Sequence, residues 1–333
     1  MSLVLASRAV SAVRDGVATD KWDAALHAIG GHFLQSAGWQ RVQQELGQQV
    51  VHAEAEGWVW AGPLRLGAFP RYLYLPYGPA AGDALPEALR AAVSAARERE
   101  LDFIRVEPAS AGASVTTAVR TLTAAGASAV RAVQPRHTWV LDLRPGVDQL
   151  RRGLSAGHRG AVNAAPRKGV AIQSSRDPAA VTALVDLQRR NAGSSGWQGE
   201  SARYHRIEAE VLMPGGAATV YSATADGEVV AAAMCFDWMH TRYYAHAAAD
   251  PVRGRKLGAS APLVWQMILD AKAGGFTAFD FWGVAPAAPR GHPWAGFTQF
   301  KMAFGGELVT RGGTWEIPVR GLRHRLYSVL RRR

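Results

Sequence analysis

Residues 297–306 (FTQFKMAFGG) place a single lysine, Lys301, in an apolar and aromatic run that ends in two glycines. Only five of the chain's 38 basic residues are lysines, so a chain that nearly always uses arginine has a compact ammonium here. An ammonium on a flexible stem can reach a developing oxyanion as a point charge. The alternative is a lysine on the exposed side of a half-buried strand, with its stem packed and its head in water. Lys301 is therefore a candidate for stabilising negative charge during a reaction.

Asp280 is a second candidate. It follows a strand-like run and precedes Gly283, and α/β folds often place functional groups at such strand ends. A structural role is an equally good interpretation, because an aspartate in this position can cap a turn.

Residues 253–258 (RGRKLG) lie between an expected strand and an expected helix, where backbone amides can bind phosphate. The loop is similar to the pyrophosphate loop of the acetyl-coenzyme-A-dependent N-acetyltransferases, Arg/Gln-x-x-Gly-x-Gly/Ala. Lys256 replaces the first of the two glycines, and its Cβ makes a left-handed or close-approach conformation costly. A coenzyme-A-thioester-dependent N-acyltransferase is therefore the alternative function.

Other site chemistries find little support. The one cysteine, Cys235, lies in an apolar run and is expected to be a buried strand thiol. His240, His246 and His292 are not spaced like a zinc set, so no metal site is expected. There is no Gly-x-Ser-x-Gly elbow and no P-loop. No cofactor is expected.

The elements that must position these residues occur twice. Each half contains a strand beginning Arg-Tyr, a helix, and a second strand, with an offset of about 170 residues that indicates internal duplication. We expect the strands and helices listed here: strands 71–76, 103–108, 137–143, 242–247 and 276–282, helices 34–46, 85–98 and 259–273, and a hairpin of 220–224 with 228–236 turning at Asp226-Gly227. At 333 residues, two similar α/β units in tandem are predicted.

Charge and the C-terminal residues suggest polyanionic partners. The net charge is +11, which favours nucleic acid, an anionic membrane face or a phosphorylated substrate. Residues 319–333 carry apolar side chains at helical spacing among six arginines, which predicts a basic amphipathic helix for an anionic membrane face, or a final helix that packs onto the first domain. No signal or transmembrane segment is evident, so a cytoplasmic protein is expected, with peripheral contact at the cytoplasmic membrane face if the C-terminal helix binds there.

Taken in order, these motifs resemble the FemABX family, the aminoacyl-tRNA-dependent transferases that build peptidoglycan interpeptide bridges. The resemblance covers about residues 33–318. The chain lacks the charged helical-hairpin arm of some members, because the loop at 191–199 is too short to hold it. The motifs that carry the resemblance are Phe33-Leu34-Gln35-Ser36 with Trp39, Tyr74-Leu75-Pro76-Tyr77-Gly78-Pro79, Arg105-Val106-Glu107-Pro108, Gln134-Pro135-Arg136 with Val140-Leu141-Asp142-Leu143, Arg159 with Gly169-Val170, Asp280-Phe281-Trp282-Gly283, and Phe300-Lys301.

The resemblance implies an α/β (α+β) fold of two tandem acetyltransferase-like (GNAT-like) domains with mixed sheets flanked by helices. Because the C-terminal segment returns to the first domain in that fold, the expected domains are residues 1–143 plus 309–333, and 144–308. The implied reaction is attack of a stem-peptide amine on the ester of an aminoacyl-tRNA. The implied partners are aminoacyl-tRNA and a lipid-linked or UDP-linked muramyl pentapeptide.

The resemblance also implies site residues. Lys301 of the Phe300-Lys301 pair is implied to stabilise the oxyanion and the tRNA terminus. The precursor-binding positions of the family match Gln43 and Tyr204. At the position of Gln43 other members have a lysine, for which Arg41 is a substitute. An aromatic on the later strand matches Tyr243 or Tyr244, of which Tyr244 is preferred, and Asp280 completes the set. The arginine that other members pair with the matched tyrosine is replaced by Glu200, and Arg203 is a substitute from another direction.

Two other function classes stay open beside the aminoacyltransferase. One is the coenzyme-A-dependent enzyme introduced above. The other is a non-catalytic basic module that binds RNA or a membrane, which predicts that Lys301→Ala changes no activity.

Overall fold

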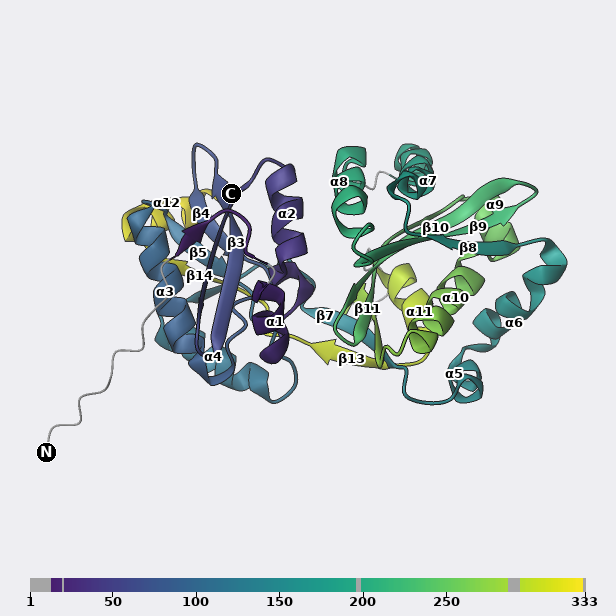
Figure 1. Cartoon of the computed structure of the whole chain (residues 1–333), viewed down its shortest axis with the longest axis horizontal. Coiled ribbons are helices and arrows are strands. Elements are labelled where there is room, and N and C mark those ends of the chain that lie inside the picture. The colour runs from purple at the N-terminus through teal and green to yellow at the C-terminus, as the bar shows by residue number, and fades with distance from the viewer. Residues whose placement is uncertain (1–12, 20, 196–198, 287–293, 332–333) are drawn as a thin grey trace, which may run out of the picture. The chain divides into compact units, whose positions relative to one another are not determined.

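The computed structural model describes residues 13–19, 21–195, 199–286 and 294–331 (Figure 1). The chain folds into two compact units, Met1–Arg136 with Arg311–Arg333, and His137–Thr310. His292, the middle of the short loop at 191–199 and the last two arginines of the tail lie outside the described residues. Within the described residues, no helix is long and apolar enough to cross a membrane.

Unit 1 is built on a seven-stranded mixed sheet in the order β1-β2-β3-β4-β5-β14-β6. Only β4 and β5 pair in parallel, and the other neighbours are antiparallel. The strands are β1 (Arg14–Asp15), β2 (Gln49–Ala55), β3 (Trp58–Leu66), β4 (Arg71–Leu75), β5 (Phe103–Val106), β6 (Ser128–Val130) and β14 (Thr314–Pro318). The helices are α1 (Lys21–Ala28), α2 (Ala37–Glu45), α3 (Leu85–Glu98), α4 (Ser114–Ala124) and α12 (Gly321–Leu330), with short 3-10 turns at Phe33–Gln35 and Gly82–Ala84.

Helix α3 shows why this unit has a core. Leu85, Leu89, Ala92 and Ala96 recur at helical spacing and are buried, and they pack on the apolar side chains of β3, β4 and β5. The helix has the bounds that the sequence predicts, since its apolar stripe is continuous and a proline stands in its first turn.

Unit 2 has a second seven-stranded mixed sheet, in the order β13-β7-β12-β11-β10-β9-β8. Here β11 and β12 are the parallel pair. The strands are β7 (His137–Asp142), β8 (Ala171–Ser175), β9 (Ala218–Ala225), β10 (Glu228–Trp238), β11 (Thr241–Ala249), β12 (Ala278–Gly283) and β13 (Glu307–Thr310). The helices are α5 (Val147–Gly153), α6 (Ala156–Ala164), α7 (Val181–Ser195), α8 (Ala202–Leu212), α9 (Arg253–Leu257), α10 (Ser260–Ala273) and α11 (Ala295–Met302), with 3-10 turns at Pro166–Lys168 and Pro178–Ala180.

The two faces of the second sheet are covered by different helices. Helices α5, α6 and α10 share one core with β9, β10 and β12, and α7 packs against β10 and β11 from the other side together with α8 (Figure 1). Cys235 is fully buried in this core, as the sequence predicts, and burial raises the pKa of its thiol to about 12. A thiol held protonated in this way is a poor nucleophile.

The predicted duplication is confirmed as two strand–helix–strand units, β4–α3–β5 and β11–α10–β12. In each, the two strands pair in parallel, with Tyr72 opposite Phe103 and Arg242 opposite Phe279. The hairpin of β9 and β10 also forms as predicted, and its turn residues Asp226 and Gly227 both have positive φ, 52° and 76°. That geometry is the type I′ turn that an Asp-Gly pair favours.

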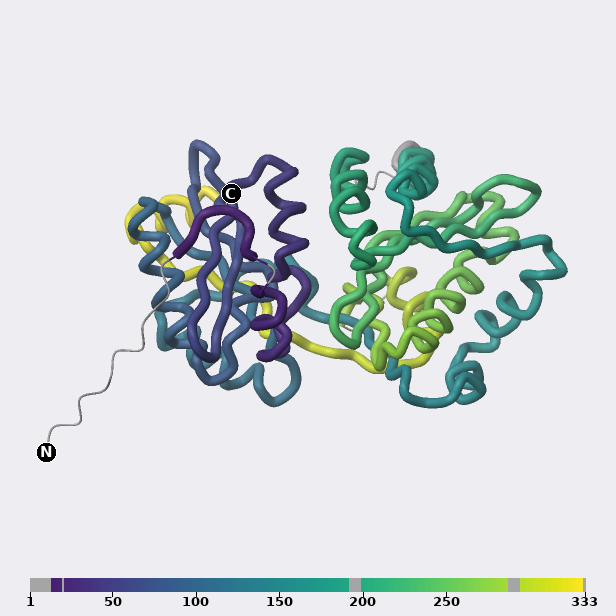
Figure 2. Tube along the Cα trace, in the orientation of Figure 1, coloured from purple at the N-terminus to yellow at the C-terminus, as the bar shows by residue number. Residues whose placement is uncertain are grey.

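The boundary between the units differs from the expected one. The sequence predicts residues 137–143 and 309–310 in the first domain, but β7 pairs with β12 and β13 in the second sheet. The chain therefore leaves unit 1 at residue 136 and returns at 311, where β14 is inserted between β5 and β6. The tube in Figure 2 shows the yellow C-terminal segment lying with the purple and blue N-terminal strands.

Candidate active site

Lys301 lies in the last turn of a helix, α11, and not in the half-buried strand that was the alternative expectation. The helix is tied to the segment after β12 because Ala285 N donates to the Thr298 hydroxyl, 2.9 Å away. The glycines that follow have positive φ, and a Cβ on Gly306 would come within 2.4 Å of the Val140 carbonyl oxygen. The two glycines therefore allow the chain to turn from α11 directly into β13.

The Lys301 ammonium donates to the carbonyl oxygen of Gly283 at the end of β12, with 2.6 Å between the two atoms. Burial lowers the pKa of Lys301 to about 8, and the negative charge of Asp280 opposes this shift. The group is therefore charged at neutral pH but is partly removed from water. A poorly hydrated cation interacts more strongly with a nearby anion than one in bulk water does.

The end of β12 is irregular, and Asp280 maintains that irregularity. Its carboxylate accepts a hydrogen bond of 2.7 Å from the Trp282 amide, and Trp282 has φ 65°, which is rare for a bulky residue. The pairing of β12 with β7 shifts register between Asp280 and Gly283. Bulges of this kind re-aim groups beside functional sites. Here the bulge presents the Gly283 carbonyl to the lysine, so the capping role considered for Asp280 is the one its geometry shows.

Phe300 and Phe304 hold the helix that carries Lys301. The Phe300 ring lies 4.9 Å from the His158 ring of α6, and Phe304 lies 5.3 Å from Phe281 of β12. Ser155 N also donates to the Ala303 carbonyl oxygen over 2.8 Å. Phe300 thus packs on the core of unit 2, where it fixes the position of its neighbour Lys301.

The two tyrosines matched to the later strand point to opposite faces of the sheet. Tyr244 packs on the α10 side against Phe279 and Phe281, and burial strongly raises the pKa of its hydroxyl. Tyr243 lies opposite Asp280 in the parallel register, and its ring meets the Trp282 ring edge-on at 5.8 Å. Tyr243, rather than the preferred Tyr244, therefore shares the surroundings of Asp280 and Lys301.

Tyr204 lies in the first turn of α8, where Ser201 caps the helix by accepting a hydrogen bond from the Tyr204 amide. Its ring lies 6.3 Å from the ring of His246 on β11, and Phe236 lies 5.8 Å from the same imidazole. Because Phe236 pairs with Tyr243 across β10 and β11, Tyr204 and Tyr243 belong to one face of the sheet. The structure thus brings together Lys301, Asp280, Trp282 and Tyr243 in unit 2, and Tyr204 lies beside His246 on the same face of the sheet as Tyr243.

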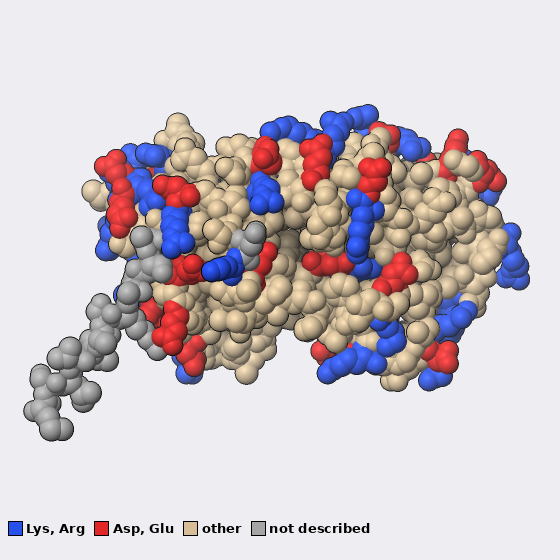
Figure 3. Space-filling model, in the orientation of Figure 1, with Lys and Arg blue, Asp and Glu red and all other residues tan. Residues whose placement is uncertain are grey.

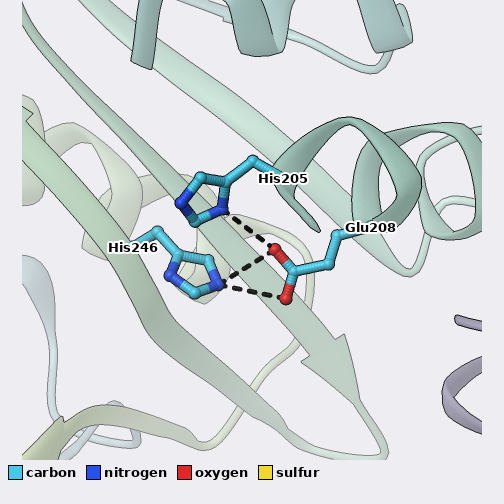
Figure 4. A group of neighbouring side chains, drawn as sticks. All are labelled: His205, Glu208 and His246. Atoms are coloured by element: carbon cyan, nitrogen blue, oxygen red, sulfur yellow. Dashed lines mark hydrogen bonds and ion pairs between the residues drawn. The ribbon is translucent and has the colours of Figure 1, made fainter. Parts of the chain in front are cut away.

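Three side chains that the sequence pattern did not connect meet beside Tyr204 (Figure 4). His205 and Glu208 lie one turn apart on α8, and His246 comes from β11. His205 Nδ1 and His246 Nε2 are each 3.1 Å from Glu208 Oε2. The only sequence pattern that could have indicated this group is the His-x-x-Glu spacing of His205 and Glu208 on a helix. The third member, His246, follows 38 positions after Glu208.

The remaining predicted site residues, Arg41 and Gln43, lie on α2 in unit 1. Gln43 is buried, and its side-chain oxygen accepts a long hydrogen bond of 3.4 Å from Arg65. Arg41 is exposed.

The loop compared with a pyrophosphate loop is partly helical, because α9 includes Lys256. Its amides already have backbone acceptors: Lys256 N donates to Val252 O, and Gly258 N donates to Arg255 O. The Lys168 ammonium lies across the loop and donates to the carbonyl oxygen of Leu257 over 3.2 Å. These bonds occupy the backbone donors that would otherwise cradle a phosphate.

Exposed basic side chains surround this loop and α6, which holds α11. In Figure 3, blue side chains follow the edge of unit 2 where α5 and α6 lie. The exposed members of this surface, here called the basic edge, are Arg151, Arg152, Arg167, Lys168, Arg255 and Lys256.

Comparison with known proteins supports this architecture. A family model described as an acetyltransferase (GNAT) domain matches residues 151–297, and no curated protein matches the chain. Among solved structures, FemX is similar over 94% of this chain and 99% of its own, with TM-score 0.81 and 16% identity. The L-PGS of Bacillus licheniformis is similar over 95% and 97% of the two chains, with TM-score 0.59 and 14% identity.

A tandem GNAT protein from the clavulanic acid biosynthesis pathway is similar over 92% of this chain and 99% of its own, with TM-score 0.51 and 15% identity. The chain therefore has the FemABX-type fold of two GNAT-like domains, as predicted.

Proposed function

We propose that this protein is an aminoacyltransferase that moves an amino acid from aminoacyl-tRNA to the side-chain amine of a peptidoglycan precursor stem peptide. The observation that supports it most is the Lys301 ammonium, which is partly buried and is held at the end of β12 by the Gly283 carbonyl. The similarity of the fold to FemX supports the same reaction class.

In this reaction the amine nitrogen attacks the ester carbonyl carbon, and the carbonyl π electrons move to oxygen. The resulting oxyanion collapses, an amide bond remains, and the tRNA 3′ oxygen leaves with a proton that the amine has lost. Since the ester is already activated, positioning and charge stabilisation supply most of the catalysis. We assign the stabilisation of the oxyanion to Lys301. The bulge at Asp280 and Trp282 is assigned the positioning of the Lys301 ammonium.

The same geometry disfavours the coenzyme-A-dependent alternative. Lys256 and Gly258 use their amides within the protein, and Lys168 covers the loop. A diphosphate would have to displace these bonds to bind there.

The basic edge is the proposed contact for tRNA phosphates. Arginine and lysine side chains that neutralise phosphates supply most of the non-specific affinity for nucleic acid. The edge is connected to the lysine helix, because α6 contacts α11 through His158 and Phe300. A tRNA bound there would therefore be close to the segment that carries Lys301.

The proposed acceptor is the lipid-linked form of the precursor, met at an anionic membrane face through α12. The apolar residues of this helix point away from the protein: Leu322 is 83% exposed, and Leu326, Val329 and Leu330 are more than half exposed. Its opposite side packs on unit 1 through Tyr327, whose ring stacks on Phe103, and through Arg323, which pairs with Asp102. An outward apolar stripe beside arginines is typical of a helix that lies in a membrane interface.

The transfer reaction is tested with purified protein, charged tRNA and muramyl pentapeptide in lipid-linked and UDP-linked forms, with product identified by mass. Wild type is expected to add one amino acid residue per transfer, and Lys301→Ala to lose at least about 100-fold in rate, the scale of losing one oxyanion donor. The matched control is Lys272→Ala. Its ammonium also donates to a backbone carbonyl of unit 2, that of Leu143, but at the opposite end of the β7–β12 pair from Gly283. Consumption of acetyl-coenzyme A without aminoacyl transfer would replace the proposal by the alternative.

Membrane contact is tested separately by sedimentation with vesicles that contain phosphatidylglycerol. Wild type is expected to co-sediment, and Leu322→Ser with Leu326→Ser to reduce binding at least about fivefold, since each buried leucine contributes about 1.5–3 kcal/mol. Leu308→Ser, at an exposed leucine of unit 2, is the control. Equal sedimentation of all variants would contradict the assignment of α12.

A further inference from the structure

Glu208 is an unusual buried carboxylate. It is completely buried, yet among the described residues it forms no ion pair with lysine or arginine, and its two oxygens face imidazole nitrogens only. A buried carboxylate is costly unless a positive charge compensates it. The compensating charge at this place must come from a protonated imidazole or from a metal ion.

The arrangement of atoms fits a metal. The three potential ligand atoms, one from each of His205, Glu208 and His246, lie within 4.8 Å of one another, and Glu208 Oε2 is 3.1 Å from both nitrogens. Zn²⁺ binds imidazole nitrogen and carboxylate oxygen at about 2.0–2.2 Å, so neighbouring ligand atoms in a tetrahedral site are roughly 3.3 Å apart. Small movements of these side chains would therefore admit the ion.

The protonation of the two imidazole rings is compatible with the binding of a metal ion. A metal would replace the hydrogen atoms that now lie between each nitrogen and the carboxylate. The proton of His205 would then move to Nε2, an atom that is buried and makes no hydrogen bond within the described part of the chain. The ring would exchange its hydrogen bond to Glu208 for a bond to the metal.

We propose that His205, Glu208 and His246 form a binding site for a divalent transition metal of the Zn²⁺ type. Two nitrogen ligands and one oxygen ligand suit zinc and its neighbours, whereas Ca²⁺ and Mg²⁺ require sites made mainly of oxygen. A fourth position is left for water or for an oxygen of a bound molecule, as in zinc sites with three protein ligands. The side chain of His246 is partly exposed, which gives the site a path to solvent.

Chelator-treated protein is titrated with Zn²⁺ by calorimetry, and with Co²⁺ while the visible absorption is recorded. One equivalent of Zn²⁺ per chain and a tetrahedral Co²⁺ spectrum are expected. Glu208→Gln and His246→Asn should weaken zinc binding at least tenfold, and His240→Asn, at an exposed histidine in the β10–β11 turn, should leave it unchanged.

If a ligand variant fails to fold, the measurements on wild type still test the proposal. Zn²⁺ should raise the Tm of wild type and of His240→Asn. If wild type neither binds Zn²⁺ nor gives the Co²⁺ spectrum, the three side chains are an internal hydrogen-bond network and the proposal is overturned. Equal affinity in a folded Glu208→Gln variant would overturn it as well.

Discussion

Lys301 combines two properties that an arginine could not provide at this position. Its ammonium is small enough to reach the Gly283 carbonyl from the last turn of α11, and its pKa of about 8 responds to burial. An arginine stays protonated under the same conditions and presents a wide planar group. The lysine can therefore lose its charge within an accessible pH range, which makes its role measurable.

The rate of aminoacyl transfer should fall as pH rises through about 8. The pKa of Lys301 is lowered, so the charged form that is proposed to stabilise the oxyanion dominates below that value and is lost above it. Single-turnover rates between pH 6 and 9.5 would show a descending limb near pH 8. In a Lys301→Arg variant that retains activity, the limb should disappear. A wild-type rate that keeps increasing to pH 9.5 would contradict a charged catalytic lysine.

At the scale of elements, the end of β12 positions several of the site residues. Phe281 of this strand packs into the core, Asp280 lies opposite Tyr243, and the Gly283 carbonyl after the bulge accepts the hydrogen bond of Lys301. This positioning depends on the unusual φ of Trp282, which the Asp280 carboxylate stabilises.

Asp280→Ala should lower both stability and transfer activity. The variant loses a charge-assisted hydrogen bond to a backbone amide, which costs about 1.5–3 kcal/mol of unfolding free energy. The Gly283 carbonyl would also lose its orientation, so kcat should decrease. Urea denaturation and transfer kinetics measure the two effects. Asp142→Ala, at an exposed carboxylate paired with Arg144, is the control and should change stability by less than about 1 kcal/mol.

At the scale of the whole molecule, unit 1 depends on the last residues of the chain. Strand β14 is inserted between β5 and β6, and it brings Glu316 into a buried cluster. The Glu316 carboxylate accepts hydrogen bonds from Arg105, Arg331 and His324. Unit 2, by contrast, builds its sheet and core from residues 137–310 alone.

Glu316→Ala should therefore destabilise unit 1 selectively. Removing one partner leaves the Arg105 guanidinium buried without its carboxylate, a change that costs about 3–5 kcal/mol. Hydrogen exchange read by mass spectrometry should show faster exchange in β5 and β14 and unchanged exchange in β10 and β11. Glu307→Ala, at an exposed residue of β13, should alter neither. Equal acceleration in both units would show that they unfold together.

The sequence by itself determined the elements that depend on local patterns. Apolar periodicity predicted α3, the Asp226-Gly227 pair predicted the hairpin, and the repeated strand–helix–strand order predicted tandem units of one fold. Local chemistry also singled out Lys301 and Asp280. These signals lie within a few residues of one another, so they can be read without knowing which strands pair.

The tertiary structure alone decided what depends on pairing across the sheet. The pairing of β7 with β12 and β13 places the unit boundary at residue 136, and the packing of the sheet decides that Tyr244 faces the core with α10 while Tyr243 takes the other face. The register of β11 against β10 brings His246 to His205 and Glu208. A one-residue change in register reverses the face of every side chain on a strand, and local sequence does not fix that register.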